Sequence, residues 1–300
     1  MKKRAKILII CGGGVFGAIP AHFLGMLPTD WQNLECVDVI AGCSIGGILS
    51  CAYAIGHQFA VIDGCFQDRA KDCFKKRWQA KINPLACPVY DSDSLYEVIE
   101  TMIGNHLMRD IRKIFPKLSL VVPALDVTSD KPLTFHNLTH EFDNVSLMEV
   151  AKMTSAAPSY FDCVEFGGHA VVDGGLIDVD GAMTAVSAVK KYCGTPFMGM
   201  DVLVLGTGQD VDKIPLTAKS YRKLNLLGIA TDILRGYATL GNKEKCKEFL
   251  SGLGLHYLNY FNPIVTDGEL DDVKQIPGIV KEAEKHRDEF VKVWEEWLNA

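Results

Sequence analysis

The 300-residue sequence lacks a long hydrophobic run and has no excess of basic residues. No stretch approaches the roughly 18 apolar residues that a membrane-spanning helix needs. The net charge of −6 argues against a nucleic acid polymer as partner, because such polymers are bound by broad basic surfaces. The apolar run before Cys11 is shorter than the roughly 7–15 residues of a signal-peptide core, so we expect a buried strand over residues 6–11.

Patterns typical of metal sites and disulfide frameworks are missing as well. The ten cysteines are irregularly spaced, and none belongs to a Cys-x-x-Cys pair. In a chain of this size, that spacing indicates reduced thiols in a reducing compartment and predicts a cytoplasmic protein. No cysteines and histidines have the spacing of a zinc site, so we expect neither a metal nor another cofactor.

What the sequence does have is the composition of a globular protein with a large core, at 48% hydrophobic and 23% charged residues. Residues 6–11 and 36–41 are predicted to be buried strands. Each is followed by a glycine turn and then a helical pattern, over residues 17–27 and 45–55. This alternation predicts an α/β fold with a mostly parallel central sheet flanked by helices.

The remainder of the chain is expected to complete one domain over residues 1–300. Residues 58–115, rich in charged and aromatic side chains, are predicted to form a helical excursion over the functional site. Residues 279–298 form an amphipathic pattern that predicts a helix capping the core, or one contacting a membrane surface or a second copy in a homodimer. Further strands are predicted over residues 118–127 and 132–137, and residues 169–178 and 200–208 are each predicted to be a strand that runs into a glycine turn. A helix is predicted over residues 149–161, ending before Pro158.

The most specific motif is the GxSxG pattern of residues 42–46, centred on Ser44, between a predicted strand and a predicted helix. This is the context of a nucleophile elbow. Glycines at positions 42 and 46 leave room for a tight turn that projects the serine hydroxyl into the open. The following helix N-terminus, with the amide of Ile45, can stabilise an oxyanion. A plain strand–helix turn is the alternative.

The glycine turn of residues 12–17 (GGGVFG) allows two interpretations. It matches GxGxxG, which is typical of a dinucleotide-binding turn, although no acidic residue lies at a clear end of the second strand. Alternatively, its consecutive glycines expose backbone amides that bind an anion. If the first two strands are neighbours, this turn opens beside Ser44, and an acyl oxyanion would lie between them.

A base for Ser44 is harder to find. His256 and His286, the only histidines after residue 200, fall in a strand-like run and a charged helical segment. Both are interpreted as structural or surface residues. Asp173 is the better candidate, because it closes an apolar strand and two glycines follow it. Burial would raise its proton affinity and let it act without a histidine.

Taken together, these residues resemble the patatin-like phospholipase family, over roughly residues 6–275. The family's motifs match in order: the glycine-rich oxyanion loop (residues 12–17), the GxSxG elbow (42–46), the S-A-A-P segment (154–161), the DG[GA] motif (173–175) and the L-G-T-G strand end (204–208). Each motif alone is ordinary, but five in the right order are specific.

The resemblance implies a patatin-like three-layer sandwich that hydrolyses acyl esters of membrane phospholipids, as a phospholipase A does, without a metal. Its implied site is the catalytic pair Ser44 and Asp173, the oxyanion amides of Gly12, Gly13, Gly14 and Ile45, and the elbow glycines Gly42 and Gly46. Such a substrate implies peripheral contact with the membrane. Some members of about this size are bacterial antiphage effectors activated by cyclic nucleotides, so a cyclic nucleotide is a candidate activator.

The sequence departs from the family pattern in two places. Cys11 and Phe16 stand where the family loop has an aspartate and a basic residue, and Asp178 and Asp180 follow the aspartate motif where an Asn-Pro pair is common. We expect retained activity with an altered rate or head-group preference, because backbone amides do the main work in the oxyanion loop. The alternative functions are a soluble carboxylesterase or lysophospholipase, a nucleotide-binding module, and a catalytically silent lipid-binding scaffold.

Overall fold

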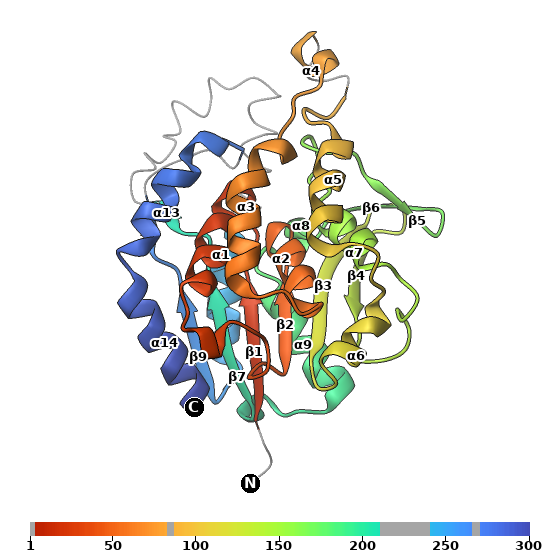
Figure 1. The fold of residues 1–300 in the computed structure, drawn as a ribbon. Coiled ribbons are helices and arrows are strands. Elements are labelled where there is room, and N and C mark those ends of the chain that lie inside the picture. Colours follow the sequence, from red (N-terminus) through yellow and green to blue (C-terminus); the bar gives the residue numbers. More distant parts are fainter. Residues whose placement is uncertain (1–3, 83–86, 211–240, 266–270) are drawn as a thin grey trace, which may run out of the picture.

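The computed structural model describes residues 4–82, 87–210, 241–265 and 271–300. In this part of the chain, helices cover both faces of a central sheet, which gives three layers (Figure 1). The predicted α/β fold with a mostly parallel sheet is therefore confirmed. The single-domain organisation stays a prediction.

The sheet has eight strands, in the order β5-β6-β3-β2-β1-β7-β9, with β4 paired to β3. Strands β3, β2, β1, β7 and β9 run parallel, and antiparallel pairs add β4, β6 and β5 at one side. Their bounds are β1 (Ala5–Ile10), β2 (Val39–Gly42), β3 (Ser119–Asp126), β4 (Lys131–His136), β5 (Val164–Phe166), β6 (His169–Asp173), β7 (Met200–Leu205) and β9 (Tyr257–Phe261). A separate pair joins β8 (Gln209–Asp210) to β10 (Ile264–Val265).

Helices occupy both faces of the sheet and surround the ends of its parallel strands (Figure 1). Their bounds are α1 (Ala18–Gly25), α2 (Ile45–Ala54), α3 (Phe59–Cys73), α4 (Trp78–Ile82), α5 (Ser92–Ile103), α6 (Ile111–Ile114), α7 (Leu147–Thr154), α8 (Gly175–Asp178), α9 (Ala182–Cys193), α12 (Gly241–Gly252), α13 (Ile276–Glu284) and α14 (Arg287–Asn299).

Strand β1 shows why its sequence is apolar without alternation. Successive side chains of a strand point to opposite faces. Leu8 and Ile10 pack into the larger core, beneath α1, α2, α3, α5 and α14, whereas Ile7 and Ile9 pack into the smaller core, against α9 and α12. All four side chains are fully buried, as expected for a strand covered by helices on both sides.

The predicted helical excursion is largely part of the core. Helices α3 and α5 pack against α1 and α2 and bury Phe59, Phe66, Leu95 and Ile99. Helix α4 is different, because it projects from the body of the protein beyond the ends of α3 and α5 (Figure 1).

The predicted C-terminal helix is two helices, α13 and α14, which meet at Lys285 and His286. The chain turns in a charged segment that offers no apolar side chain for burial. Phe290, Trp294 and Trp297 on α14 are fully buried, and the indole of Trp297 donates to the Asp201 carbonyl at 2.9 Å. The core-capping interpretation is therefore confirmed.

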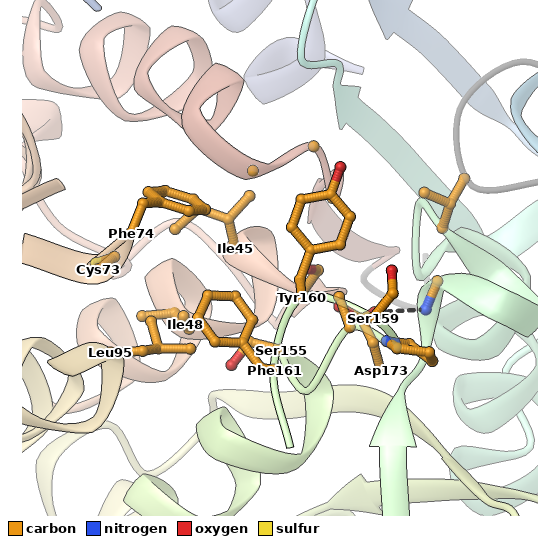
Figure 2. A pocket seen from close by; sticks show the side chains of 18 of the residues that line it. Ile45, Ile48, Cys73, Phe74, Leu95, Ser155, Ser159, Tyr160, Phe161 and Asp173 are labelled. Atoms are coloured by element: carbon orange, nitrogen blue, oxygen red, sulfur yellow. Dashed lines mark hydrogen bonds between the residues drawn. The ribbon is translucent and has the colours of Figure 1, made fainter. Parts of the chain in front are cut away.

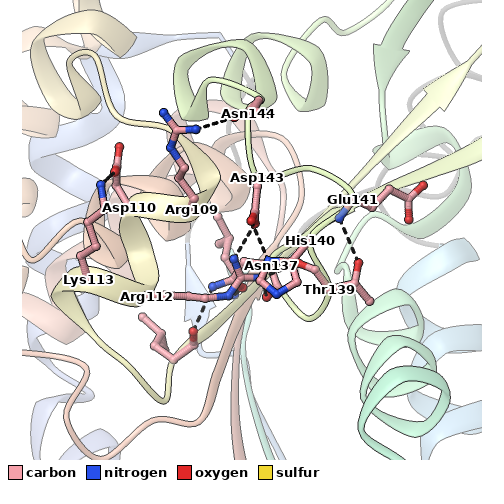
Figure 3. Close-up of polar contacts among 12 residues, drawn as sticks. Arg109, Asp110, Arg112, Lys113, Asn137, Thr139, His140, Glu141, Asp143 and Asn144 are labelled. Atoms are coloured by element: carbon pink, nitrogen blue, oxygen red, sulfur yellow. Dashed lines mark hydrogen bonds and ion pairs between the residues drawn. The ribbon is translucent and has the colours of Figure 1, made fainter.

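A polar network holds the connection between β4 and α7 (Figure 3). The guanidinium of Arg112 donates to the carbonyls of Asn137 and Thr139 and pairs with Asp143. The Asn137 side chain in turn bridges the backbone of β3, accepting from the Leu120 amide at 2.7 Å. These contacts fix the start of α7, whose other end reaches the candidate site.

The predicted end of one helix is wrong. Helix α7 ends at Thr154 rather than near Pro158, because the Ala156 carbonyl accepts from the amide of Asp173 at 3.0 Å instead of continuing the helix. Residues 155–161 therefore form an irregular segment. Strand β6 ends at Asp173, as predicted for a strand that runs into a glycine turn, and α8 follows it.

Candidate active site

Ser44 lies in a sharp turn between β2 and α2, the context that its motif predicts. Its backbone has φ 54° and ψ −126°, a combination that costs a non-glycine residue roughly 1–3 kcal/mol. A Cβ on Gly42 would lie 2.3 Å from the Gly46 carbonyl oxygen, and a Cβ on Gly46 would lie 2.0 Å from that of Ile10. The two glycines are therefore required by close backbone approach.

Thr154 holds this turn from the neighbouring helix end. Its hydroxyl accepts from the amide of Ser44 at 3.1 Å and donates to the carbonyl of Pro123 at 2.7 Å. Thr154 is fully buried, so both contacts are shielded from water. The Ser44 amide is thereby occupied, and Ser44 is tied to the middle of β3.

We expect Thr154→Val to lower kcat for ester hydrolysis about tenfold with little change in KM, because a displaced nucleophile affects chemistry more than binding. It should also lower the free energy of unfolding by about 2–3 kcal/mol, since two buried polar groups lose their partner. Thr154→Ser keeps the hydroxyl and serves as the matched control in steady-state kinetics and thermal unfolding. A Thr154→Val enzyme with unchanged kcat would show that this contact does not position Ser44.

Asp173 ends β6 and contacts the same turn. It is 5% exposed, and burial raises its pKa to about 6, although hydrogen bonds from the Ser44 hydroxyl, the Gly175 amide and the Cys43 thiol oppose that rise. The Gly175 amide donates to Oδ1 at 2.7 Å and the Cys43 thiol at 3.6 Å. The carboxyl group is thus fixed in orientation and is a stronger base than an exposed aspartate.

All eight histidines belong to the described part of the chain, and none of them lines the cavity that contains Ser44. His256, just before β9, contacts Asp201 at 2.7 Å. His286, between α13 and α14, contacts Glu289 at 3.2 Å. Both are structural or surface residues, as the sequence predicts.

The glycine turn of residues 12–17 adjoins Ser44 but is used differently from the prediction at one position. The Gly12 amide donates to the Val179 carbonyl at 2.9 Å, so Gly12 is wrong as an oxyanion donor. Within the described residues, the amides of Gly13 and Gly14 have no such acceptor. The same holds for Ile45, whose amide is in the first turn of α2, where no partner exists within the helix.

Ser44, Asp173 and the glycine turn line one cavity of about 360 Å³. Figure 2 shows apolar side chains on one side of it and Asp173 on the other. The apolar wall comes from α2, α3, α5 and the segment after α7: Ile45, Ile48, Phe66, Ala70, Cys73, Phe74, Leu95, Tyr160 and Phe161. A site of this kind can hold a hydrocarbon chain while a polar group of the ligand meets Ser44.

The family model described as "Patatin-like phospholipase" matches residues 8–186. The chain belongs to the patatin-like phospholipase family. It is 33% identical over 199 residues to a cGAMP-activated phospholipase of Escherichia coli (strain TW11681), covering 59% of this chain and 53% of that protein. It is 26% identical over 248 residues to a cGAMP-activated phospholipase of Vibrio cholerae, covering 73% and 68%. The chain thus spans about half of the first of these relatives and two thirds of the second.

Among solved structures, VipD from Legionella pneumophila aligns with 97% of this chain and 67% of its own chain, at a TM-score of 0.48 and 10% identity.

The departures from the patatin-like pattern have visible consequences. Cys11 is fully buried, and its sulfur lies 3.9 Å from the Tyr260 hydroxyl. Phe16 packs against the larger core and does not line the cavity. Asp178 accepts from the Thr184 amide at the start of α9, at 2.7 Å, and from the Cys246 thiol, at 3.4 Å. It therefore holds α9 rather than Asp173.

A second motif of the family contacts the glycine turn through a hydrogen bond. The Thr207 hydroxyl, in the L-G-T-G segment, donates to the Gly12 carbonyl at 3.0 Å. A Cβ on Gly13 would lie 2.5 Å from that same hydroxyl oxygen. This close approach explains why the patatin-like loop needs glycine where it crosses the end of β7.

Three further findings concern features that the sequence lacks. All ten cysteines are free thiols. Among the described helices, none combines the length and apolar character needed to cross a bilayer. Within the described ranges, no three His, Cys, Asp or Glu side chains are grouped as ligands of a metal ion would be. That no metal or cofactor takes part stays a prediction.

Proposed function

We propose that this patatin-like chain hydrolyses acyl esters of membrane phospholipids, with Ser44 as nucleophile and Asp173 as its base. One observation carries the proposal: a strained, half-buried serine and a buried aspartate with a raised pKa line the same largely apolar cavity. The family membership supports the same reaction class.

In the first half of the reaction, the Ser44 Oγ attacks the ester carbonyl carbon and its proton passes to the Asp173 carboxylate. The tetrahedral intermediate then collapses, and the leaving alcohol takes the proton from Asp173. In the second half, Asp173 removes a proton from water, which attacks the acyl-enzyme. Ser44 regains its proton as the fatty acid leaves, so one acidic group serves both halves.

The oxyanion that forms in each half needs hydrogen-bond donors in fixed positions. We assign this role to the amides of Gly13, Gly14 and Ile45, which line the cavity beside Ser44. The N-terminus of α2 adds a favourable dipole at the same point. Gly12 contributes by holding the turn through Val179 rather than by donating to the substrate.

The chemistry of the cavity wall favours an acyl chain over a nucleotide. Its α2, α3 and α5 residues are apolar, and none of the described residues that line it is lysine or arginine. The free amides of Gly13, Gly14 and Ile45 could donate to a phosphate as they would to an oxyanion, but the apolar wall offers no side chain to pair with the remaining phosphate charge. This argument supports the lipid hydrolase over a dinucleotide-binding module at the GGGVFG turn.

Two of the relatives are named cGAMP-activated phospholipases. We extend the proposal to this chain: a cyclic dinucleotide raises its hydrolase activity. The likeness to those relatives supports it, and the activation is tested together with the reaction.

We expect the chain to release free fatty acid from mixed phospholipid vesicles, and to release more when cGAMP is added. Fatty acids and lysophospholipids are measured by mass spectrometry, with a monomeric short-chain ester as comparison substrate. Release from the monomeric ester alone would favour the soluble carboxylesterase. No release from either substrate, with or without the nucleotide, would contradict the proposed reaction.

A further inference from the structure

We propose that Lys75, Lys76, Arg77 and Trp78, here called the α4 tip, form the surface by which this protein binds an anionic lipid membrane. The proposal rests on the proposed function, because it names the surface that brings the cavity to a phospholipid substrate. It concerns residues outside the cavity that contains Ser44.

The α4 tip exposes a large aromatic side chain where the fold does not require one. Trp78 is 66% exposed, whereas Trp294 and Trp297 are fully buried. Helix α4, which begins at Trp78, projects beyond α3 and α5 and away from the rest of the described protein (Figure 1). An indole on a projecting segment suits the head-group region of a bilayer, where its ring is buried and its N–H stays hydrated.

The charge around this indole is opposite to that of the whole chain. Residues 71–78 contain four basic residues and one acidic residue, while the net charge of the chain is −6. Arg77 is paired with Asp162, and Asp91 lines the same shallow hollow as residues 75–79. Lys75 and Lys76 are exposed and give the tip its positive charge, which complements anionic lipid head groups.

The α4 tip is joined by backbone hydrogen bonds to the wall of the cavity. The Lys75 carbonyl accepts from the Asp91 amide, and the Arg77 amide donates to Val89. The next bonds along this ladder run from Val89 to Ser159 and from Tyr90 to Tyr160, at 3.0 and 2.9 Å. Ser159 and Tyr160 line the cavity.

The chain immediately before the tip makes the same connection. Cys73 and Phe74 line the cavity, and the ring of Phe74 packs edge-on against Tyr90, with centroids 5.3 Å apart. A membrane bound at the tip would therefore lie next to residues that line the acyl cavity. An acidic protein would satisfy the lysines equally well, but it would not account for the indole beside a cavity suited to hydrocarbon.

The test uses the full chain with Ser44→Ala, so that vesicles stay intact. Sedimentation measures its partition onto phosphatidylcholine vesicles that contain either no phosphatidylglycerol or about 30 mol% of it. We expect the Ser44→Ala chain to bind the anionic vesicles. Its partition coefficient should fall about tenfold when either Trp78→Ala or Lys75→Glu/Lys76→Glu is added. A blue shift of tryptophan fluorescence on binding should disappear in Trp78→Ala.

Matched controls come from the opposite end of the sheet. Met198 is 76% exposed on a short 3₁₀ turn that leads into the start of β7, and Lys190 and Lys191 lie nearby at the end of α9. Met198→Ala and Lys190→Glu/Lys191→Glu should bind anionic vesicles within twofold of the parent. Equal losses in the control and tip variants would overturn the proposal, because they would show a nonspecific charge effect.

Failure of this proposal can be told apart from failure of the proposed function. In chains that keep Ser44, the tip variants should hydrolyse a soluble short-chain ester at the rate of the unmodified chain. The proposed membrane-binding surface is wrong if the Ser44→Ala chain does not bind anionic vesicles, or if the tip variants bind them equally well. That conclusion holds even when the ester is hydrolysed. If the ester and phospholipids are both left intact, the reaction fails while the partition data still decide the tip.

Discussion

Replacement of Ser44 by alanine is expected to lower kcat/KM for phospholipid hydrolysis by about 10⁴-fold or more. Alanine offers no atom to form the acyl-enzyme, and the cavity alone would leave only the residual rate that comes from binding and from the oxyanion amides. Fatty acid release from vesicles gives the rate. A fluorophosphonate probe should label the unmodified chain and leave the variant unlabelled.

Ser50→Ala is the control for this experiment. Ser50 is buried on the same helix, α2, and donates to the Gly46 carbonyl at 2.7 Å. Its loss should lower the free energy of unfolding by about 1 kcal/mol and leave the probe labelling intact. Phospholipid hydrolysis that persisted in Ser44→Ala would remove Ser44 as the nucleophile, and equal losses in both variants would point to damage of α2.

The stability of the Ser44 variants carries separate information. Ser44→Gly should raise the free energy of unfolding by about 1 kcal/mol relative to Ser44→Ala, because glycine adopts a positive φ without the steric cost. The strain at Ser44 is thus tolerated because the surrounding core fixes the turn. Buried contacts from Thr154 and the close packing of Gly42 against Gly46 leave the chain no alternative path.

The parts of the site that the sequence predicts are those where backbone geometry restricts the residue type. Gly42 and Gly46 are required because their Cβ atoms would meet carbonyl oxygens, and this requirement appears as the GxSxG pattern. Asp173 is recognisable for a similar reason, since Gly174 approaches the Pro123 carbonyl too closely for a side chain. Long buried strands such as β1 are predictable from their apolar residues alone.

The parts that sequence reasoning missed depend on contacts between distant segments. Nothing in the sequence of the GGGVFG turn shows that the Gly12 amide donates to the Val179 carbonyl. The cavity wall was missed because Phe66 and Leu95 follow the same helical spacing as ordinary core residues. The end of α7 depends on a strand partner, Asp173, that its own sequence does not contain.

Asp173→Asn is the second substitution with a large expected effect, a fall in kcat/KM of about 10³–10⁴-fold. Asparagine keeps the shape of the side chain but cannot accept the Ser44 proton. The matched control is Asp178→Asn, which removes another buried carboxylate that does not line the cavity. It should keep the activity and lose about 1 kcal/mol of stability, because Asp178 holds the start of α9.

The pH dependence of the unmodified enzyme should follow the ionisation of Asp173. The base must be deprotonated to accept the serine proton, and burial raises its pKa to about 6. We therefore expect kcat/KM for a neutral short-chain ester to fall about tenfold per pH unit below pH 6 and to level off above pH 7. A profile that stayed flat down to pH 5 would contradict Asp173 as the base.

The same raised pKa gives Asp173→Asn an opposite effect on stability. The folded state holds the proton of Asp173 up to about pH 6, whereas an unfolded chain releases it near its ordinary value of 3.8. Ionised Asp173 therefore lowers the stability of the fold progressively as the pH rises from about 4 to 6, and this cost persists above pH 6. Asparagine carries no charge and removes the cost, which is up to about 3 kcal/mol at pH 8.

Thermal unfolding of Asp173→Asn and its control Asp178→Asn at pH 4 and pH 8 separates a catalytic role for Asp173 from a structural one. If Asp173 is kept for proton transfer, Asp173→Asn should be inactive yet more stable than the unmodified chain at pH 8, with the gain vanishing at pH 4. A residue kept for the fold would show the reverse, a loss of stability that accompanies the loss of activity. Inactivity together with lower stability at pH 8 would therefore assign Asp173 to holding the elbow, and the base for Ser44 would have to be sought elsewhere in the cavity.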